Sequence, residues 1–81
     1  MEMKYVILKS RNFLVFPPTM EHASVTTCPR DVVSAGFVNV APHAQEDGRV
    51  EAHCFGESVS LGVRADPEGD SAILTRAFNT H

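Results

Sequence analysis

The chain reads GRVEAHCFGESVSLGVR over residues 48–64, and this stretch does most to decide the fold. Apolar and polar residues alternate from Arg49 to Phe55 and again from Glu57 to Arg64, with Gly56 between the two runs. A period of two residues is typical of a half-buried β-strand, and a glycine between two such runs permits a tight turn. We therefore predict two successive antiparallel strands.

A C-terminal helix is predicted directly after these strands, over residues 66–79. Asp66 can accept a backbone N–H as the N-cap, and Pro67 is tolerated at the first helical position. Acidic residues in the first turn, Glu68 and Asp70, favour the positive end of the helix dipole. An apolar face should dock on the sheet, and the polar side chains of the last turns should point away from it. The docking residues are Ile73, Leu74 and Phe78, and the outward residues are Thr75, Arg76 and Asn79.

Upstream, residues 1–16 predict an N-terminal hairpin. Met3–Leu8 is rich in apolar strand formers, which favours a central strand buried on both faces. Phe13–Phe16 follows a polar break and is stopped by Pro17, which cannot donate to a ladder. We expect this hairpin to join the same sheet, or to be exchanged with a neighbouring subunit.

Two further segments complete the predicted order. Residues 17–31 are flanked by prolines and show no sustained period, apart from a helical turn expected around Thr19–Ala23 with Thr19 as its cap. A loop of this length in a small domain is often functional, so we treat it as a candidate site. Val32–Ala41 is the longest predicted strand. It begins a three-stranded meander over residues 32–64 that turns back at Gly48.

Together these elements predict a single α+β domain over residues 1–81: an antiparallel sheet of about five strands with one C-terminal amphipathic helix packed on one face. A chain of 81 residues has room for one small core and buries only about 60–65% of its unfolded surface. Self-association is a common way to cover the remainder, so we expect a homo-oligomer.

Charge and composition exclude several classes of partner. The net charge is −3, and Lys and Arg do not form the cluster that a phosphate backbone requires, so we expect no nucleic-acid partner. No apolar run approaches the ~20 residues of a membrane span or resembles a signal peptide. We therefore expect a cytoplasmic protein, with no membrane contact, whose cysteines are reduced.

Histidine and cysteine are the residues of this sequence that could bind a metal ion or act as a nucleophile. His22, Cys28, His53 and Cys54 offer the nitrogen and sulfur ligands that zinc prefers. His53 and Cys54 are adjacent on a predicted strand, so their side chains point to opposite faces and cannot share one ion. One alternative therefore stays open: a metal- or thiol-dependent activity centred on His22 and Cys28, together with His53 or Cys54. No catalytic or cofactor motif accompanies them, and we expect no cofactor.

Small residues recur on two of the predicted strands. If the strands share one sheet, these residues form a smooth outward strip that a second subunit can approach closely. The predicted interface residues are Ser34, Gly36, Ser58, Ser60 and Gly62.

These observations favour a small non-enzymatic interaction or assembly module that binds copies of itself or another protein. Its contact surface is expected at a strand edge, at the small-residue strip or in residues 17–31. Such a module fits a component of a larger particle, for example a phage-type structural protein. A further alternative is a small-molecule-binding domain that uses a pocket between helix and sheet.

Overall fold

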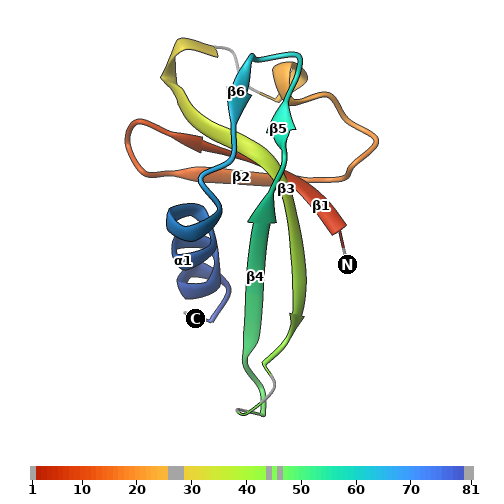
Figure 1. Ribbon diagram of the computed structural model, residues 1–81, viewed down its shortest axis with the longest axis vertical. Helices are drawn as coiled ribbons and strands as arrows, with labels where there is room; N and C mark the ends of the chain where they lie inside the picture. Colours follow the sequence, from red (N-terminus) through yellow and green to blue (C-terminus); the bar gives the residue numbers. More distant parts are fainter. Residues whose placement is uncertain (1, 26–28, 44, 46, 80–81) are drawn as a thin grey trace.

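Six strands and one α-helix form the fold in the part of the chain that the computed structural model describes, residues 2–25, 29–43, 45 and 47–79 (Figure 1). The order of the elements is β1 (Glu2–Leu8), β2 (Phe13–Phe16), two short 3-10 helices η1 (His22–Ser24) and η2 (Pro29–Asp31), β3 (Val32–Pro42), β4 (Val50–Phe55), β5 (Glu57–Ser58), β6 (Val63–Arg64) and α1 (Pro67–Phe78).

The main sheet has four antiparallel strands in the order β2-β1-β3-β4. This confirms the predicted α+β class, with an antiparallel sheet and a C-terminal helix packed against it. β1 lies centrally, and Tyr5, Val6 and Ile7 are buried because both faces of this strand are covered. β1 and β2 form the predicted hairpin within the sheet of their own chain.

The longest strand, β3, pairs with two neighbouring strands. It pairs with β1 from Val32 to Asn39 and with β4 from Phe37 to Pro42, and Figure 1 shows it curving from one to the other. Gly36 lies in this bend, where a Cβ atom would overlap the carbonyl oxygen of Phe55. Glycine is therefore required here by the close approach of another backbone segment.

The prediction that residues 57–64 form the third strand of the meander is wrong. Residues 57–64 form a separate two-stranded hairpin, in which Glu57 pairs with Arg64 and Ser58 with Val63. The chain reverses because Gly62 adopts a φ of 69° and donates its N–H to the Ser58 carbonyl at 2.8 Å. A side-chain contact supports the turn, since Leu61 N–H donates to Ser58 Oγ at 3.2 Å. The alternating pattern belongs to two strands of two residues each, with the turn between them.

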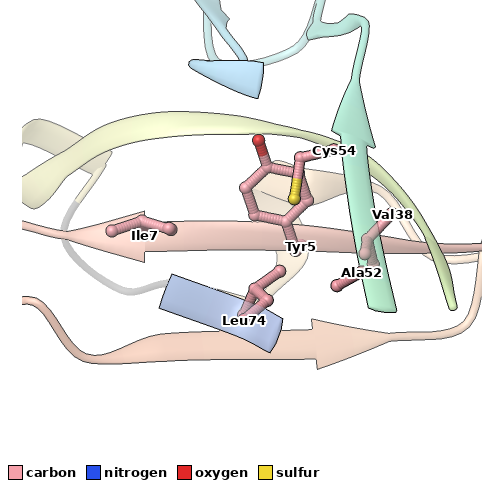
Figure 2. Close-up of a cluster of buried hydrophobic side chains, with 6 residues drawn as sticks. All are labelled: Tyr5, Ile7, Val38, Ala52, Cys54 and Leu74. Carbon is pink, nitrogen blue, oxygen red and sulfur yellow. The ribbon is translucent and has the colours of Figure 1, made fainter. Parts of the chain in front are cut away.

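Apolar side chains fill both sides of the sheet. On one side, α1 covers a buried cluster of Tyr5, Ile7, Val38, Ala52, Cys54 and Leu74, which Figure 2 shows between the strands and the helix. On the other side is a second cluster of Val6, Phe16, Val32 and Ala35. Val25, which follows η1, packs on it together with Leu61 and Val63 of the β5–β6 hairpin. The sheet therefore lies between two layers.

The helix begins as predicted, with Asp66 accepting the N–H of Gly69 at 3.4 Å as its N-cap. Leu74 is fully buried, and Ile73 and Phe78 pack beside it. None of the described helices has both the length and the apolar character to cross a membrane.

Two local predictions are corrected. Thr75 and Asn79 do not point away from the sheet: both bond to the backbone of β4, while Arg76 is exposed as expected. The helical turn expected at Thr19–Ala23 begins later, at His22, and its N-cap position is Glu21, with no side-chain cap. Thr19 instead lies in a preceding turn, which Met20 N–H closes on the Pro17 carbonyl at 3.1 Å.

Candidate functional site

One edge of the main sheet is closed by the helix. The outward N–H groups of β4 belong to Val50, Ala52 and Cys54. They donate to side chains of α1 and its C-cap: Asn79 Oδ1 at 3.0 Å, Thr75 Oγ1 at 2.9 Å and Ser71 Oγ at 2.8 Å, respectively. The spacing fits, because four helical residues rise about 6.0 Å and two strand residues about 6.6 Å.

Two of these side chains also return a bond to the strand. Asn79 Nδ2 donates to the Val50 carbonyl at 2.8 Å, and Thr75 Oγ1 donates to the Ala52 carbonyl at 3.3 Å. The helix therefore takes the place of the next strand. An edge satisfied in this way offers little to a foreign strand.

The opposite edge, β2, is not covered in this way. Leu8 N–H donates to the Asn12 carbonyl at 2.8 Å, which sets the phase of the β1–β2 ladder. The backbones of Leu14 and Phe16 therefore point toward β1, and those of Phe13 and Val15 point outward. Within the described part of the chain, no hydrogen bond joins the backbone of Phe13 or Val15 to a group beyond the β1–β2 pair.

Apolar side chains accompany this open edge. Leu14 is 42% exposed, although it is a large aliphatic residue. On the helix side, Phe13 packs edge-on against Phe78 with ring centroids 6.5 Å apart, and Phe13 and Val15 are both only partly buried. The strand contains no charged residue, the usual protection of an exposed edge.

The predicted small-residue strip does not form on the surface. Ser34, Gly36 and Ser58 are buried inside the chain's own fold. The alternation of small residues is misleading because the Ser34 side chain points into the fold, where Oγ donates to Asp70 Oδ1 at 2.8 Å. Ser60 and Gly62 are exposed near the β5–β6 turn, and their contact with a second subunit stays a prediction.

The candidate metal and thiol residues are dispersed. His22 is buried, with Nε2 donating to the Gly36 carbonyl at 2.8 Å and its ring edge-on to Phe16 and Phe37. His53 is exposed and lies 3.3 Å from Glu51, whereas Cys54 is buried on the opposite face. Cys28 lies outside the described residues. In the described ranges, no three His, Cys, Asp or Glu side chains are arranged to hold a metal ion.

Burial also makes the thiol of Cys54 less reactive. It raises the pKa of Cys54 to about 11, although bonds with Ser71 and Tyr5 act in the other direction. The thiolate is the form that attacks or ligates, so Cys54 is held in its unreactive form at neutral pH. Figure 2 shows its sulfur beside the Tyr5 ring, within the core.

A buried polar network went unpredicted. Asp70 is 3% exposed and accepts three hydrogen bonds: from the Tyr5 hydroxyl, from Ser34 Oγ at 2.8 Å and from Asp66 N–H at 3.0 Å. Burial, followed by the bond to Asp70, raises the pKa of the Tyr5 hydroxyl above its ordinary value. One sequence signal was available: a tyrosine in a central strand needs a partner for its hydroxyl.

Two grooves flank the helix. One, of about 580 Å³, lies between the β1–β2 turn and the start of α1 and is lined by residues that include Lys9, Arg11, Ser34 and Asp70. The other, of about 530 Å³, follows α1 beside β4 and is lined by residues that include Arg49, His53 and Arg76. Binding of a small molecule between helix and sheet stays a prediction.

Comparison of the chain with protein-family models, with curated proteins and with solved structures finds no match. Its function is therefore argued from the geometry of its surfaces.

Proposed function

We propose that this protein is a small non-enzymatic assembly module that associates with copies of itself through the open edge of β2. The observation that carries the proposal is the contrast between the two sheet edges. α1 satisfies the outward N–H groups of β4 with three side chains. In β2, beside the exposed Leu14, no described residue bonds to the outward backbone groups of Phe13 and Val15. An open apolar edge is a template for another strand.

The size of the domain supports the same proposal. A chain of 81 residues has one modest core, and association is a frequent source of the missing stability. The apolar layer under α1 reaches the β2 edge at Phe13 and Val15, where it is only partly buried. A partner strand would extend this layer.

We place the module in the cytoplasm, where a thiol such as Cys54 stays reduced. A symmetric unit of this kind would suit a larger particle, such as a phage-type structural assembly. We propose no role for a metal or thiol at His22, His53 and Cys54, since these three side chains lie apart.

Sedimentation velocity over a range of concentrations tests the proposal. The expected species is larger than the 8.8 kDa monomer, and it should dissociate in the Val15→Pro variant. Proline removes the outward N–H of Val15, which β1 does not use, so the hairpin should be retained. The control, Val59→Lys, removes an apolar side chain that is 87% exposed and belongs to the β5–β6 turn, and it should leave association unchanged. A wild-type monomer at every concentration, or a Val15→Pro variant that associates normally, would overturn the proposal.

The two grooves beside α1 favour a second candidate, the binding of a small molecule. Screening a fragment library by amide chemical shifts tests it. The expected result is a saturable ligand whose shifts cluster at Lys9, Ser34 and Ile73 around the larger groove. A library in which no fragment gives saturable shifts in either groove would remove this candidate.

A further inference from the structure

We infer that the partner of β2 is β2 of a second copy, paired antiparallel about a two-fold axis beside Leu14. This inference rests on the proposed self-association and adds the register and symmetry of the contact. Identical copies that meet through the same surface form an isologous contact, and two equivalent strand edges related by such an axis run antiparallel.

The backbone of β2 defines the register. Its outward-pointing residues are Phe13 and Val15, each with one N–H and one carbonyl group. When Phe13 faces the partner's Val15, symmetry places Val15 opposite the partner's Phe13. Two residues that face each other in this way exchange both of their hydrogen bonds. Both outward N–H groups and both outward carbonyls of each copy are then satisfied.

Neighbouring registers are less favourable, because the strand is bounded on both sides by residues that cannot donate. Beyond Val15, the next outward position is Pro17, which has no N–H. Beyond Phe13, it is Arg11, whose N–H already donates to the Leu8 carbonyl at 2.9 Å. A shift of two residues in either direction would therefore leave an outward group of β2 without its partner. Only the register centred on Leu14 pairs all of them.

The side chains agree with this register. Leu14, 42% exposed, faces the Leu14 of the partner subunit at a position without hydrogen bonds, where the Cα atoms of an antiparallel pair lie about 4.5 Å apart. On the other face of the sheet, Phe13 lies beside the partner's Val15. The half-buried layer of Phe13, Val15 and Phe78 would continue into the second copy.

The same geometry ends growth through the sheet edges at two copies. Pairing the β2 edges joins two four-stranded sheets, and the outer edges of the joined sheet are then the two β4 strands. Each β4 strand is already satisfied by Ser71, Thr75 and Asn79 of its own chain. The contact is therefore closed, and the sheet edges give a dimer instead of a fibre.

A cysteine placed on the axis tests the register. The variant is Leu14→Cys in a Cys28→Ser background, in which the remaining native thiol, Cys54, is buried. Mild oxidation should give a disulfide-linked dimer, since a Cα separation of about 4.5 Å lies within the range that a disulfide spans. The matched control is Asn12→Cys in the same background. The two copies of residue 12 would lie roughly 13 Å apart along the strands, so this variant should stay uncrosslinked.

Complementary charges at residue 14 test the two-fold symmetry of the contact without a covalent crosslink. Leu14→Lys and Leu14→Glu should each be monomeric, because two like charges would face each other across the axis. An equimolar mixture should restore dimers that contain one copy of each variant, detected by native mass spectrometry. A residue with only a structural role within its own chain would show no such rescue.

The outcomes separate the two claims. If the wild-type protein associates and Val15→Pro dissociates it, but Leu14→Cys does not crosslink or the charge mixture does not pair, the two-fold register is wrong and the proposed function stands. Equal crosslinking of Asn12→Cys and Leu14→Cys would also overturn the register. A wild-type protein that stays monomeric overturns the proposed function itself.

Discussion

Asn79 and Val50 exchange two hydrogen bonds: the Val50 N–H donates to Asn79 Oδ1 at 3.0 Å, and Asn79 Nδ2 donates to the Val50 carbonyl at 2.8 Å. The side-chain amide of the helix C-cap thus stands in for the peptide group of a neighbouring strand. One and two turns earlier, Thr75 and Ser71 accept the N–H groups of Ala52 and Cys54 in the same way, and Thr75 also donates back to the Ala52 carbonyl. This contact closes one edge of the sheet and leaves β2 as the edge that can accept a partner.

Asn79→Ala is expected to destabilise the fold by about 1–2 kcal/mol, since each lost hydrogen bond contributes about 1 kcal/mol. Urea denaturation monitored by circular dichroism measures the change. Ser10→Ala, in the exposed β1–β2 turn, is the control and should stay within about 0.5 kcal/mol of the wild type. A change for Asn79→Ala no larger than that of the control would show that the pairing with Val50 contributes nothing.

Gly36→Ala is expected to cost about 1–3 kcal/mol, because the added methyl group overlaps the Phe55 carbonyl and also approaches Ala65. The comparison is Gly48→Ala. Nothing lies within 4 Å of the added methyl group there, and the cost is only that of a positive φ of 80°, about 1 kcal/mol. Thermal unfolding should rank Gly36→Ala as the less stable variant. The reverse order would contradict the close approach of the two backbones.

Arg11→Gly is expected to stabilise the hairpin by about 0.5–1 kcal/mol. Arg11 adopts a φ of 70°, where a side chain is strained and glycine is not. Lys9→Gly, two residues earlier in the same turn, should be neutral or destabilising, because it relieves no such strain and adds freedom to the unfolded chain. Melting temperatures of the two variants compare them directly. A lower melting temperature for Arg11→Gly would contradict this assignment of strain.

Tyr5→Phe is expected to cost about 1.5–3 kcal/mol, because it removes a hydroxyl donor from the buried carboxylate of Asp70. The double variant Tyr5→Phe/Ser34→Ala should cost more than the sum of the single changes, since Asp70 then keeps only the N–H of Asp66. Chemical denaturation of all three variants provides the cycle. A neutral Tyr5→Phe substitution would show that the network is not a source of stability.

Stability should decline at alkaline pH. The pKa of Cys54 is raised to about 11 in the fold, against about 8.5 in an unfolded chain. The unfolded state therefore loses this proton first, so the stabilisation is complete below about pH 8.5 and is lost as pH rises toward 11. The raised pKa of Tyr5 acts in the same direction above about pH 10, where an unfolded tyrosine begins to ionise. Unfolding free energies measured from pH 7 to 11 should fall less steeply in Cys54→Ala, and an equal slope would contradict the assignment.

The strands and the helix were largely predictable from sequence because their signals are local. Each signal can be read from a few neighbouring residues: the period-two alternation of the strands, the prolines after Phe16 and the Asp66-Pro67 helix cap. The segment 57–64 was misread because an alternating pattern does not show that Gly62 adopts a positive φ and reverses the chain.

The site was less predictable, since its contacts join residues far apart in the chain. The sequence pattern predicts that Thr75 and Asn79 face solvent. Only the packing of the helix against the edge of β4 shows that both bond to the strand backbone. Ser34 likewise reads as a surface residue until Asp70 is brought to it across 36 positions. The openness of β2 follows from the strand order, which no local pattern specifies.

Amide hydrogen exchange, measured by NMR at low and high protein concentration, tests the central claim most directly. The N–H groups of Val50, Ala52 and Cys54 should be protected at every concentration, because α1 satisfies them within the chain. Those of Phe13 and Val15 should exchange rapidly in dilute protein and become protected as the copies associate. Rapid exchange of Phe13 and Val15 at every concentration would contradict the account, since the open edge would then take no partner strand.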